Sequence, residues 1–243
     1  PALFAAAVIG RGWSADTPAD WRLPPLDGEL AGEFDAVLLG GAPKVKWKAT
    51  FRTANPRERT IDFSIEGHGL RVRGGARVDP MGEGDWRVVE SEIDLGVWFG
   101  WIAPKAMPAT GAASFSGTMR ATGNGTWRAG VLGGQASLSL RDGRIEDVKR
   151  AMLLEGISVD VEIADLAARR TEPEQVFTWS SGRYEKIPLG VGRIEFMLEG
   201  DQVRVNNAAF DLFGGELRVG SLVMSTARPE FSVDAEMIGV EVG

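Results

Sequence analysis

The feature that most constrains this chain is a one-by-one alternation of apolar and polar residues, repeated in almost every segment. Successive side chains of a β-strand point to opposite faces, so a period of two places all the apolar residues of a strand on one face. Runs of this kind recur from residues 44–52 to residues 231–236. One-sided alternation at this density predicts an antiparallel sheet with one apolar and one wet face, and it argues against parallel strands buried on both faces.

Short glycine-containing stretches stand between the alternating runs and predict the hairpin turns of this sheet. They are "EGHG" (66–69), "GEGD" (82–85), "GNGT" (123–126), "RDGR" (141–144) and "EGDQ" (199–202). Helix is scarce, and "IDLGVWFGWIAP" (93–104) predicts a short amphipathic helix that stops at Pro104. "RIEDVKRAMLLEG" (144–156) fits a helix or a long strand, and we favour the strand.

An internal repeat indicates modular construction. Residues 70–97 resemble residues 217–242, with a turn two residues shorter in the second copy. A period this long predicts an elongated sheet whose modules contact chiefly their neighbours, and we expect loose modules at 27–104 and 111–243 within a single β-rich segment. The chain starts at Pro1 and stops within a strand pattern, so we expect a segment of a larger repeating protein.

Composition narrows the function classes. The formal net charge of −7 argues against a nucleic-acid partner. The absence of cysteine excludes disulfides, thiolate metal sites and cysteine nucleophiles. No apolar run is long enough to span a bilayer, so no membrane segment is expected in this piece.

Residues suited to catalysis or metal binding are few. His68 is the only histidine and lies in a turn, no nucleophile-elbow pattern is present, and the acidic residues show no calcium-loop spacing. We therefore expect a solvent-facing His68, no metal, no cofactor and no enzymatic activity. Tryptophans in irregular or helix-like segments either plug a sheet end or pack as satellite core: Trp13, Trp21, Trp98 and Trp101.

A basic strand leaves two interpretations open. "KVKWKATFR" (44–52) places Lys44, Lys46, Lys48 and Arg52 on one face, which suits either phosphate binding or a charged face that prevents aggregation between sheets. Trp47 falls on the opposite face, so a basic surface interleaved with aromatic residues is not formed. This favours the charged face that prevents aggregation over phosphate binding.

The C-terminal half carries a resemblance to a known family. Its elements are "GGQASLSLRDGRIED" (133–147), Pro173 with Gln175, "YEKIPLGVG" (184–192) and "AFDLFGGEL" (209–217), in that order. This series resembles the YdbH-type family, once labelled dicarboxylate transport, which belongs with the AsmA-like and TamB-like proteins of the diderm bacterial envelope. The resemblance covers residues 130–243 and, more loosely, the preceding module, whereas residues 1–60 match only in character.

The resemblance implies a fold and a function. The implied fold is all-β, a long twisted antiparallel sheet folded lengthwise into a U-shaped groove, with one or two short helices. The implied function is a segment of a periplasmic bridge that passes phospholipid between the inner and outer membranes. The full-length protein would be anchored in the inner membrane and work with membrane proteins on both sides, among them a small outer-membrane lipoprotein. No catalytic residues and no cofactor are implied.

The predicted groove lining is an apolar set on one continuous concave face. It comprises Val159, Val161, Ile163, Phe196, Leu198, Val203, Val205, Leu217, Val219, Phe231 and Val233. If this face is open, Val205→Asp should fold, because the charge reaches water; in a sealed core it should not. The alternative is a non-enzymatic envelope assembly or structural module with a filled core that binds protein partners. An enzyme acting on polysaccharide across a tryptophan-bearing β-surface is the third possibility.

Overall fold

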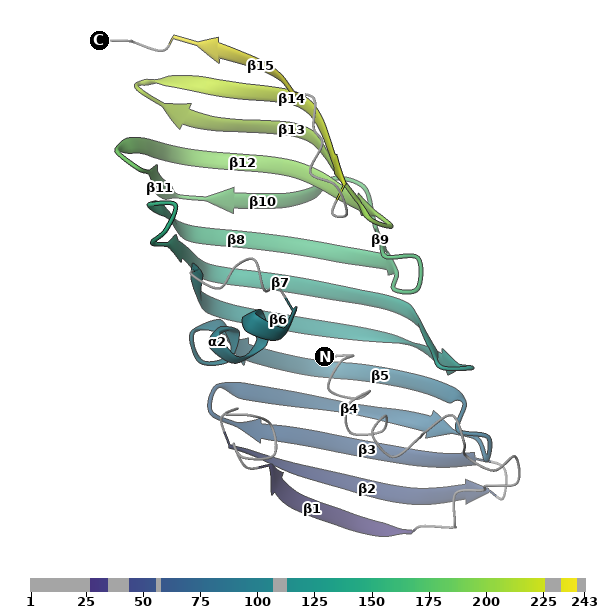
Figure 1. Ribbon diagram of the computed structural model, residues 1–243. Coiled ribbons are helices and arrows are strands. Elements are labelled where there is room, and N and C mark those ends of the chain that lie inside the picture. Colours follow the sequence, from purple (N-terminus) through teal and green to yellow (C-terminus); the bar gives the residue numbers. More distant parts are fainter. Residues whose placement is uncertain (1–26, 35–43, 56–57, 107–112, 226–232, 240–243) are drawn as a thin grey trace.

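The computed structural model describes residues 27–34, 44–55, 58–106, 113–225 and 233–239, and these form one long antiparallel sheet (Figure 1). Its longer strands are β1 (Gly28–Phe34), β2 (Val45–Asn55), β3 (Glu58–Gly67), β4 (Leu70–Val78), β5 (Gly84–Asp94), β6 (Ala113–Arg128), β7 (Val131–Asp147), β8 (Met152–Asp165), β12 (Ile187–Glu199), β13 (Gln202–Leu212), β14 (Gly215–Ser225) and β15 (Val233–Ile238). Three short strands, β9 (Arg170–Thr171), β10 (Gln175–Trp179) and β11 (Ser181–Tyr184), share the space between β8 and β12.

Neighbouring strands in the sheet are also neighbours in the sequence. The order runs from β1 to β15 without a crossover, and β9 and β11 pair beside β10 with both β8 and β12. The two outermost strands do not pair with each other, so the sheet is open. The predicted all-β class and long antiparallel sheet are thereby confirmed. The lengthwise U-shaped fold is not shown and stays a prediction.

Helix α2 (Leu95–Ala106) interrupts the succession of strands between β5 and β6. The predicted helix therefore forms, but its predicted end at Pro104 is wrong by two residues. A proline in the last turn removes one hydrogen bond without ending the helix at that residue. Residues 144–156 form no helix, as we preferred, but the predicted long strand is wrong, because the segment is the end of β7, a turn at 148–151 and the start of β8.

Two of the five predicted turns are wrong. Residues 123–126 lie inside β6, and residues 141–144 lie inside β7. Asp142 has φ of 51° and the register with β8 shifts on both sides of Gly143, so "RDGR" is a β-bulge. "EGHG" and "EGDQ" are the β3–β4 and β12–β13 turns, while "GEGD" straddles the end of the β4–β5 turn and the start of β5.

The best-packed part of the molecule lies where α2 rests on the sheet. Trp98 is 1% exposed and its indole Nε1–H donates a hydrogen bond to the carbonyl of His68 at 3.0 Å. It belongs to one buried cluster with Val45, Leu70, Val72 and Ile93. Of the described residues, only those of α2 cover a face of the sheet, and Figure 1 shows this helix in front of β5 and β6.

The opposite face of the sheet carries the charges. Arg141 forms an ion pair with Asp160 at 2.6 Å across β7 and β8, and Lys48 forms one with Glu29 at 2.7 Å across β1 and β2. Arg120 similarly pairs with Glu92 at 3.0 Å. These side chains are exposed, so each pair contributes at most about 1 kcal/mol. Their main effect is to define a wet face.

Candidate functional site

The apolar face of the sheet is the most extensive feature that the alternation creates. Directly opposed residues on neighbouring strands place their side chains on the same face. Following these partners across the sheet gives one unbroken series, here called the apolar row. It comprises Leu70, Ile93, Met119, Leu140, Val159, Phe177, Ile194, Ala208 and Val219, from β4 to β14. With strands about 4.8 Å apart, the row spans about 38 Å.

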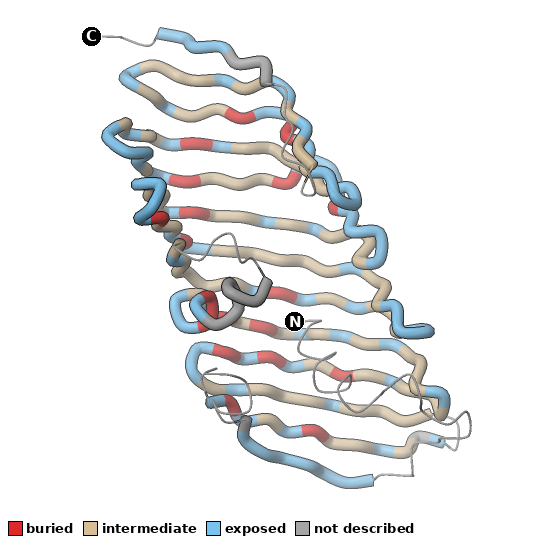
Figure 2. The backbone as a smooth tube through the Cα atoms, in the orientation of Figure 1, coloured by how far each residue is buried: buried red, intermediate tan, exposed pale blue. Residues whose placement is uncertain are grey.

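Much of this face is accessible to solvent. Met119, Leu140, Val159, Ile194 and Val219 are only half-buried, although all of them lie on interior strands. Figure 2 shows intermediate burial along much of the interior strands. Apolar residues that a second layer would normally cover are thus left within reach of a ligand.

Aromatic residues on the apolar face are paired systematically with glycine. The cross-strand pairs are Trp47 with Gly32, Phe63 with Gly74, Trp86 with Gly125, Trp127 with Gly84, and Trp179 with Gly192. A Cβ atom on Gly192 would lie 1.9 Å from Cζ2 of Trp179, and one on Gly74 would lie 2.6 Å from Cζ of Phe63. These two rings therefore occupy the space of the missing side chain and lie against the neighbouring strand.

These glycines are functional candidates that the sequence reasoning missed. Gly123 and Gly125 were interpreted as turn residues, yet both lie on the apolar face, and a Cβ atom on Gly123 would come 3.2 Å from the Trp86 ring. The available signal was their position, because each glycine occupies an apolar place in the alternation. The arrangement adds apolar area without raising a ridge across the strands.

Nine of the eleven predicted lining residues have described side chains, and the strand register places all nine on the apolar face. Phe231 and the side chain of Val233 lie outside the described residues. Val159 and Val219 belong to the apolar row itself, while Phe196 opposes Val205 and Leu198 opposes Val203. The register does not test whether these residues bind lipid.

The expectation for Val205 needs correction. Its side chain is 6% exposed, so a charge at this position would not reach water as an open groove requires. Val219, on the next strand, is half-buried and offers the better position for such a substitution.

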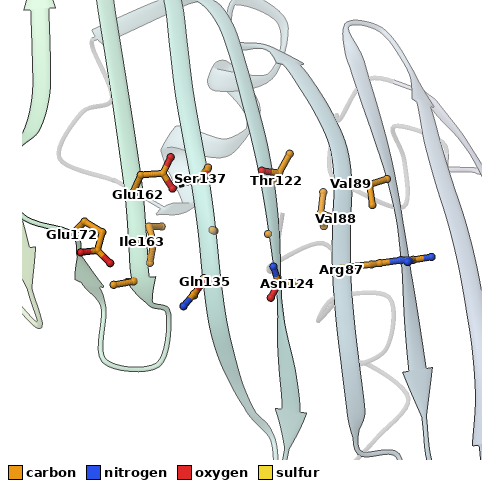
Figure 3. A pocket seen from close by; sticks show the side chains of 13 residues that line it. Arg87, Val88, Val89, Thr122, Asn124, Gln135, Ser137, Glu162, Ile163 and Glu172 are labelled. Atoms are coloured by element: carbon orange, nitrogen blue, oxygen red, sulfur yellow. Dashed lines mark hydrogen bonds between the residues drawn. The ribbon is translucent and has the colours of Figure 1, made fainter.

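Two open depressions lie on the polar face. The first, of about 400 Å³, crosses β5 to β8 and is lined chiefly by Arg87, Thr122, Asn124, Gln135, Ser137 and Glu162 (Figure 3). The Ser137 hydroxyl donates a hydrogen bond to the Glu162 carboxylate at 2.5 Å, so these two groups satisfy each other. The second, of about 600 Å³, lies beside Lys46, Glu66, His68 and Arg71. The lining of the first depression contains no histidine, and that of the second contains no serine, threonine or cysteine.

The remaining candidates from the sequence are also located. His68 is exposed in the β3–β4 turn. In the basic strand, Lys44, Lys48 and Arg52 form ion pairs with Glu33, Glu29 and Asp62, and Trp47 lies on the apolar face. Trp98 packs in the core, whereas Trp13, Trp21 and the side chain of Trp101 lie outside the described residues.

Within the described part of the chain, no group of three or more histidine or acidic side chains is placed to hold a metal ion. The same residues include no helix that is both long and apolar enough to cross a bilayer.

Comparisons with protein-family models, curated proteins and solved structures found no match for this chain.

Proposed function

We propose that this chain carries phospholipid by holding acyl chains against the apolar face of its sheet. The observation that supports the proposal is the apolar row, an unbroken apolar path across nine strands. Six of its members are only half-buried: Met119, Leu140, Val159, Phe177, Ile194 and Val219. A ligand that matches the apolar row is long and apolar and needs no directional contacts such as hydrogen bonds. An acyl chain has these properties, and the proposed activity is transport without a catalytic step.

The energetics of such binding are adequate without a specialised pocket. Burying a methylene group contributes about 0.8 kcal/mol. An acyl chain of about sixteen carbons that buries half of its surface on an open face would therefore gain about 6 kcal/mol before the cost of ordering it. Binding of this strength allows a lipid to stay on the sheet and still move along it.

The resemblance to the YdbH-type family supports a cellular setting for this activity. In that setting the chain is a segment of a bridge across the periplasm between the inner and outer membranes. The full-length protein is anchored in the inner membrane and works with membrane proteins at both ends, including a small outer-membrane lipoprotein. A lengthwise U-shaped curvature of the sheet would then shelter the acyl chains between its rims.

A second candidate function is a structural envelope module whose apolar face is covered by a partner protein. The burial of Trp179, Val205 and Ala208 favours it, because this part of the face is already packed like a core. A partner with its own apolar sheet would complete such a core. The two functions differ in what occupies the face near Val219.

The test compares one substitution on the two faces of β14. Val219 lies on the apolar face opposite Ala208, and Val223 lies on the polar face opposite Arg204. We expect Val219→Asp to fold with a loss of about 1–3 kcal/mol and to lose copurifying phospholipid, measured by mass spectrometry of an organic extract. Val223→Asp is the matched control and should keep its lipid.

Three outcomes separate the possibilities. Lipid loss in the Val219 variant alone supports the transport function. Wild-type protein without lipid, but with a stoichiometric protein partner that the Val219 variant loses, would favour the structural module. Equal lipid content in both folded variants would show that the apolar face does not hold the lipid.

A further inference from the structure

Three neighbouring turns lie together at one end of the strands, and they differ in charge from the turns at the other end. They join β7 to β8 (148–151), β11 to β12 (185–186) and β13 to β14 (213–214). The backbone N–H of Glu185 donates a hydrogen bond to the carbonyl of Ala151 at 2.8 Å, which ties the first two turns together. Figure 1 shows all three on the left-hand side of the sheet, and Figure 2 shows them as exposed chain.

Each turn presents a large apolar side chain to solvent. Val148 is 76% exposed, Tyr184 at the end of β11 is 45% exposed, and Phe213 is 46% exposed. Single exposed apolar residues need no explanation, but three on adjacent turns form a group. None of them contributes to the apolar row.

Phe213 also adopts an unfavourable backbone conformation. Its φ is 49° and that of Gly214 is 75°, so the pair occupies the centre of a two-residue hairpin with both residues in the left-handed region. Asn-Gly is the favoured sequence for this turn, and a bulky aromatic residue is disfavoured in its first position. An exposed phenylalanine that costs stability at a turn points to a use outside the fold.

Basic residues accompany these apolar side chains. Lys149 and Arg150 lie beside Val148, and Lys186 lies two residues after Tyr184, while Glu185 is the only acidic residue of the three turns. Arg150 forms an ion pair with Asp147 at 2.8 Å. Among the described residues, neither Lys149 nor Lys186 is seen in an ion pair. Both ammonium groups are thus available to an external anion.

The turns at the other end of the strands are acidic. Their charged residues are Asp79, Glu83, Glu172, Glu174 and Asp201, against Arg169 in the turns that the structure describes. A negatively charged surface would therefore attract one end of the strands and repel the other. The difference in charge between the two ends therefore determines which end of the strands would face a negatively charged surface.

We propose that Val148, Lys149, Arg150, Tyr184, Lys186 and Phe213, here called the tip patch, dock the protein on an anionic phospholipid bilayer. The three apolar side chains enter the interfacial region, and the lysines contact phosphate groups of the lipid headgroups. The strands then meet the membrane with their ends, and the acidic turns point away from it. This site is separate from the apolar face and does not require that lipid travels along it.

The test is flotation of the purified chain with vesicles of phosphatidylcholine alone or mixed with phosphatidylglycerol. Wild type should bind the mixed vesicles and lose binding as salt rises. Phe213→Asn should raise the melting temperature, because asparagine suits the turn, and yet weaken vesicle binding. Lys149→Gln and Lys186→Gln should each weaken binding about fivefold. Met81→Asn is the control, because Met81 is an apolar residue that is 74% exposed in an acidic turn, and it should leave binding unchanged.

Failure of this proposal is distinguishable from failure of lipid transport. Val219→Asp should bind vesicles like wild type, because it leaves the tip patch intact. Absence of vesicle binding, or equal binding by the wild-type, Phe213 and lysine variants, would overturn the docking site. Loss of vesicle binding in Val219→Asp alone would place the membrane contact on the apolar face and would also overturn it.

Discussion

Gly192 lies beneath the indole of Trp179, and this single contact illustrates how the apolar face is built. A Cβ atom at this position would come 1.9 Å from the ring, so the ring must move or the strands must separate. We expect Gly192→Ala to destabilise the protein by about 1–3 kcal/mol, measured by urea unfolding. Gly220→Ala is the control, because no atom lies within 4 Å of its added methyl group. If both variants lose equal stability, backbone effects and not ring packing explain the loss.

Asp147 controls the shape of the turn that carries Val148 and Lys149. Its buried carboxylate accepts hydrogen bonds from the Arg150 backbone N–H at 3.1 Å and from the Arg150 guanidinium at 2.8 Å, and these contacts lower the pKa of Asp147. A lowered folded-state pKa stabilises the protein above the ordinary aspartate pKa of about 4, and this stability is lost as pH falls through the lower value. Asp147→Asn should therefore be less stable than wild type near neutral pH, with the gap closing at low pH. A gap independent of pH would contradict this.

Helix α2 is the one described element that leaves the sheet and packs back on it. Trp98 fastens it through the buried cluster and the hydrogen bond to His68. Trp98→Ala should cost about 3–5 kcal/mol, measured by thermal or urea unfolding. The neighbouring Val97 is exposed, and Val97→Ala should change stability by less than about 0.5 kcal/mol. A small loss in the Trp98 variant would mean that α2 is only loosely attached.

The strands could be predicted from sequence far better than the turns. Alternation identifies a strand because one face is apolar and the other is wet, and the pairing of Val159 with Phe177 and of Phe196 with Val205 preserves that division. A glycine in the sequence is ambiguous, because glycine occurs in turns, in β-bulges and opposite aromatic rings on a neighbouring strand. Gly125 and Gly143 were assigned to turns for this reason. Only the partner on the next strand, which the sequence does not specify, resolves the choice.

The sheet separates four surfaces with different chemistry. One face is apolar and partly open, the other face carries cross-strand ion pairs, and the two sets of strand ends differ in charge. Sequence analysis predicted the first division through the period of two. It missed the difference between the strand ends, because that requires knowing which turns come together. The burial of Val205 was equally hidden, since exposure on one face depends on how neighbouring side chains pack.

If acyl chains lie along the half-buried part of the apolar face, crosslinking at positions along the sheet should detect them. A photoreactive benzophenone amino acid would be placed at Leu140, Val161, Ile194 and Val219 on the apolar face, and at Ser64 and Ser139 on the polar face. We expect phospholipid adducts at every apolar position and none at the two serines. Adducts only to protein, or lipid adducts at equal yield on both faces, would contradict this expectation.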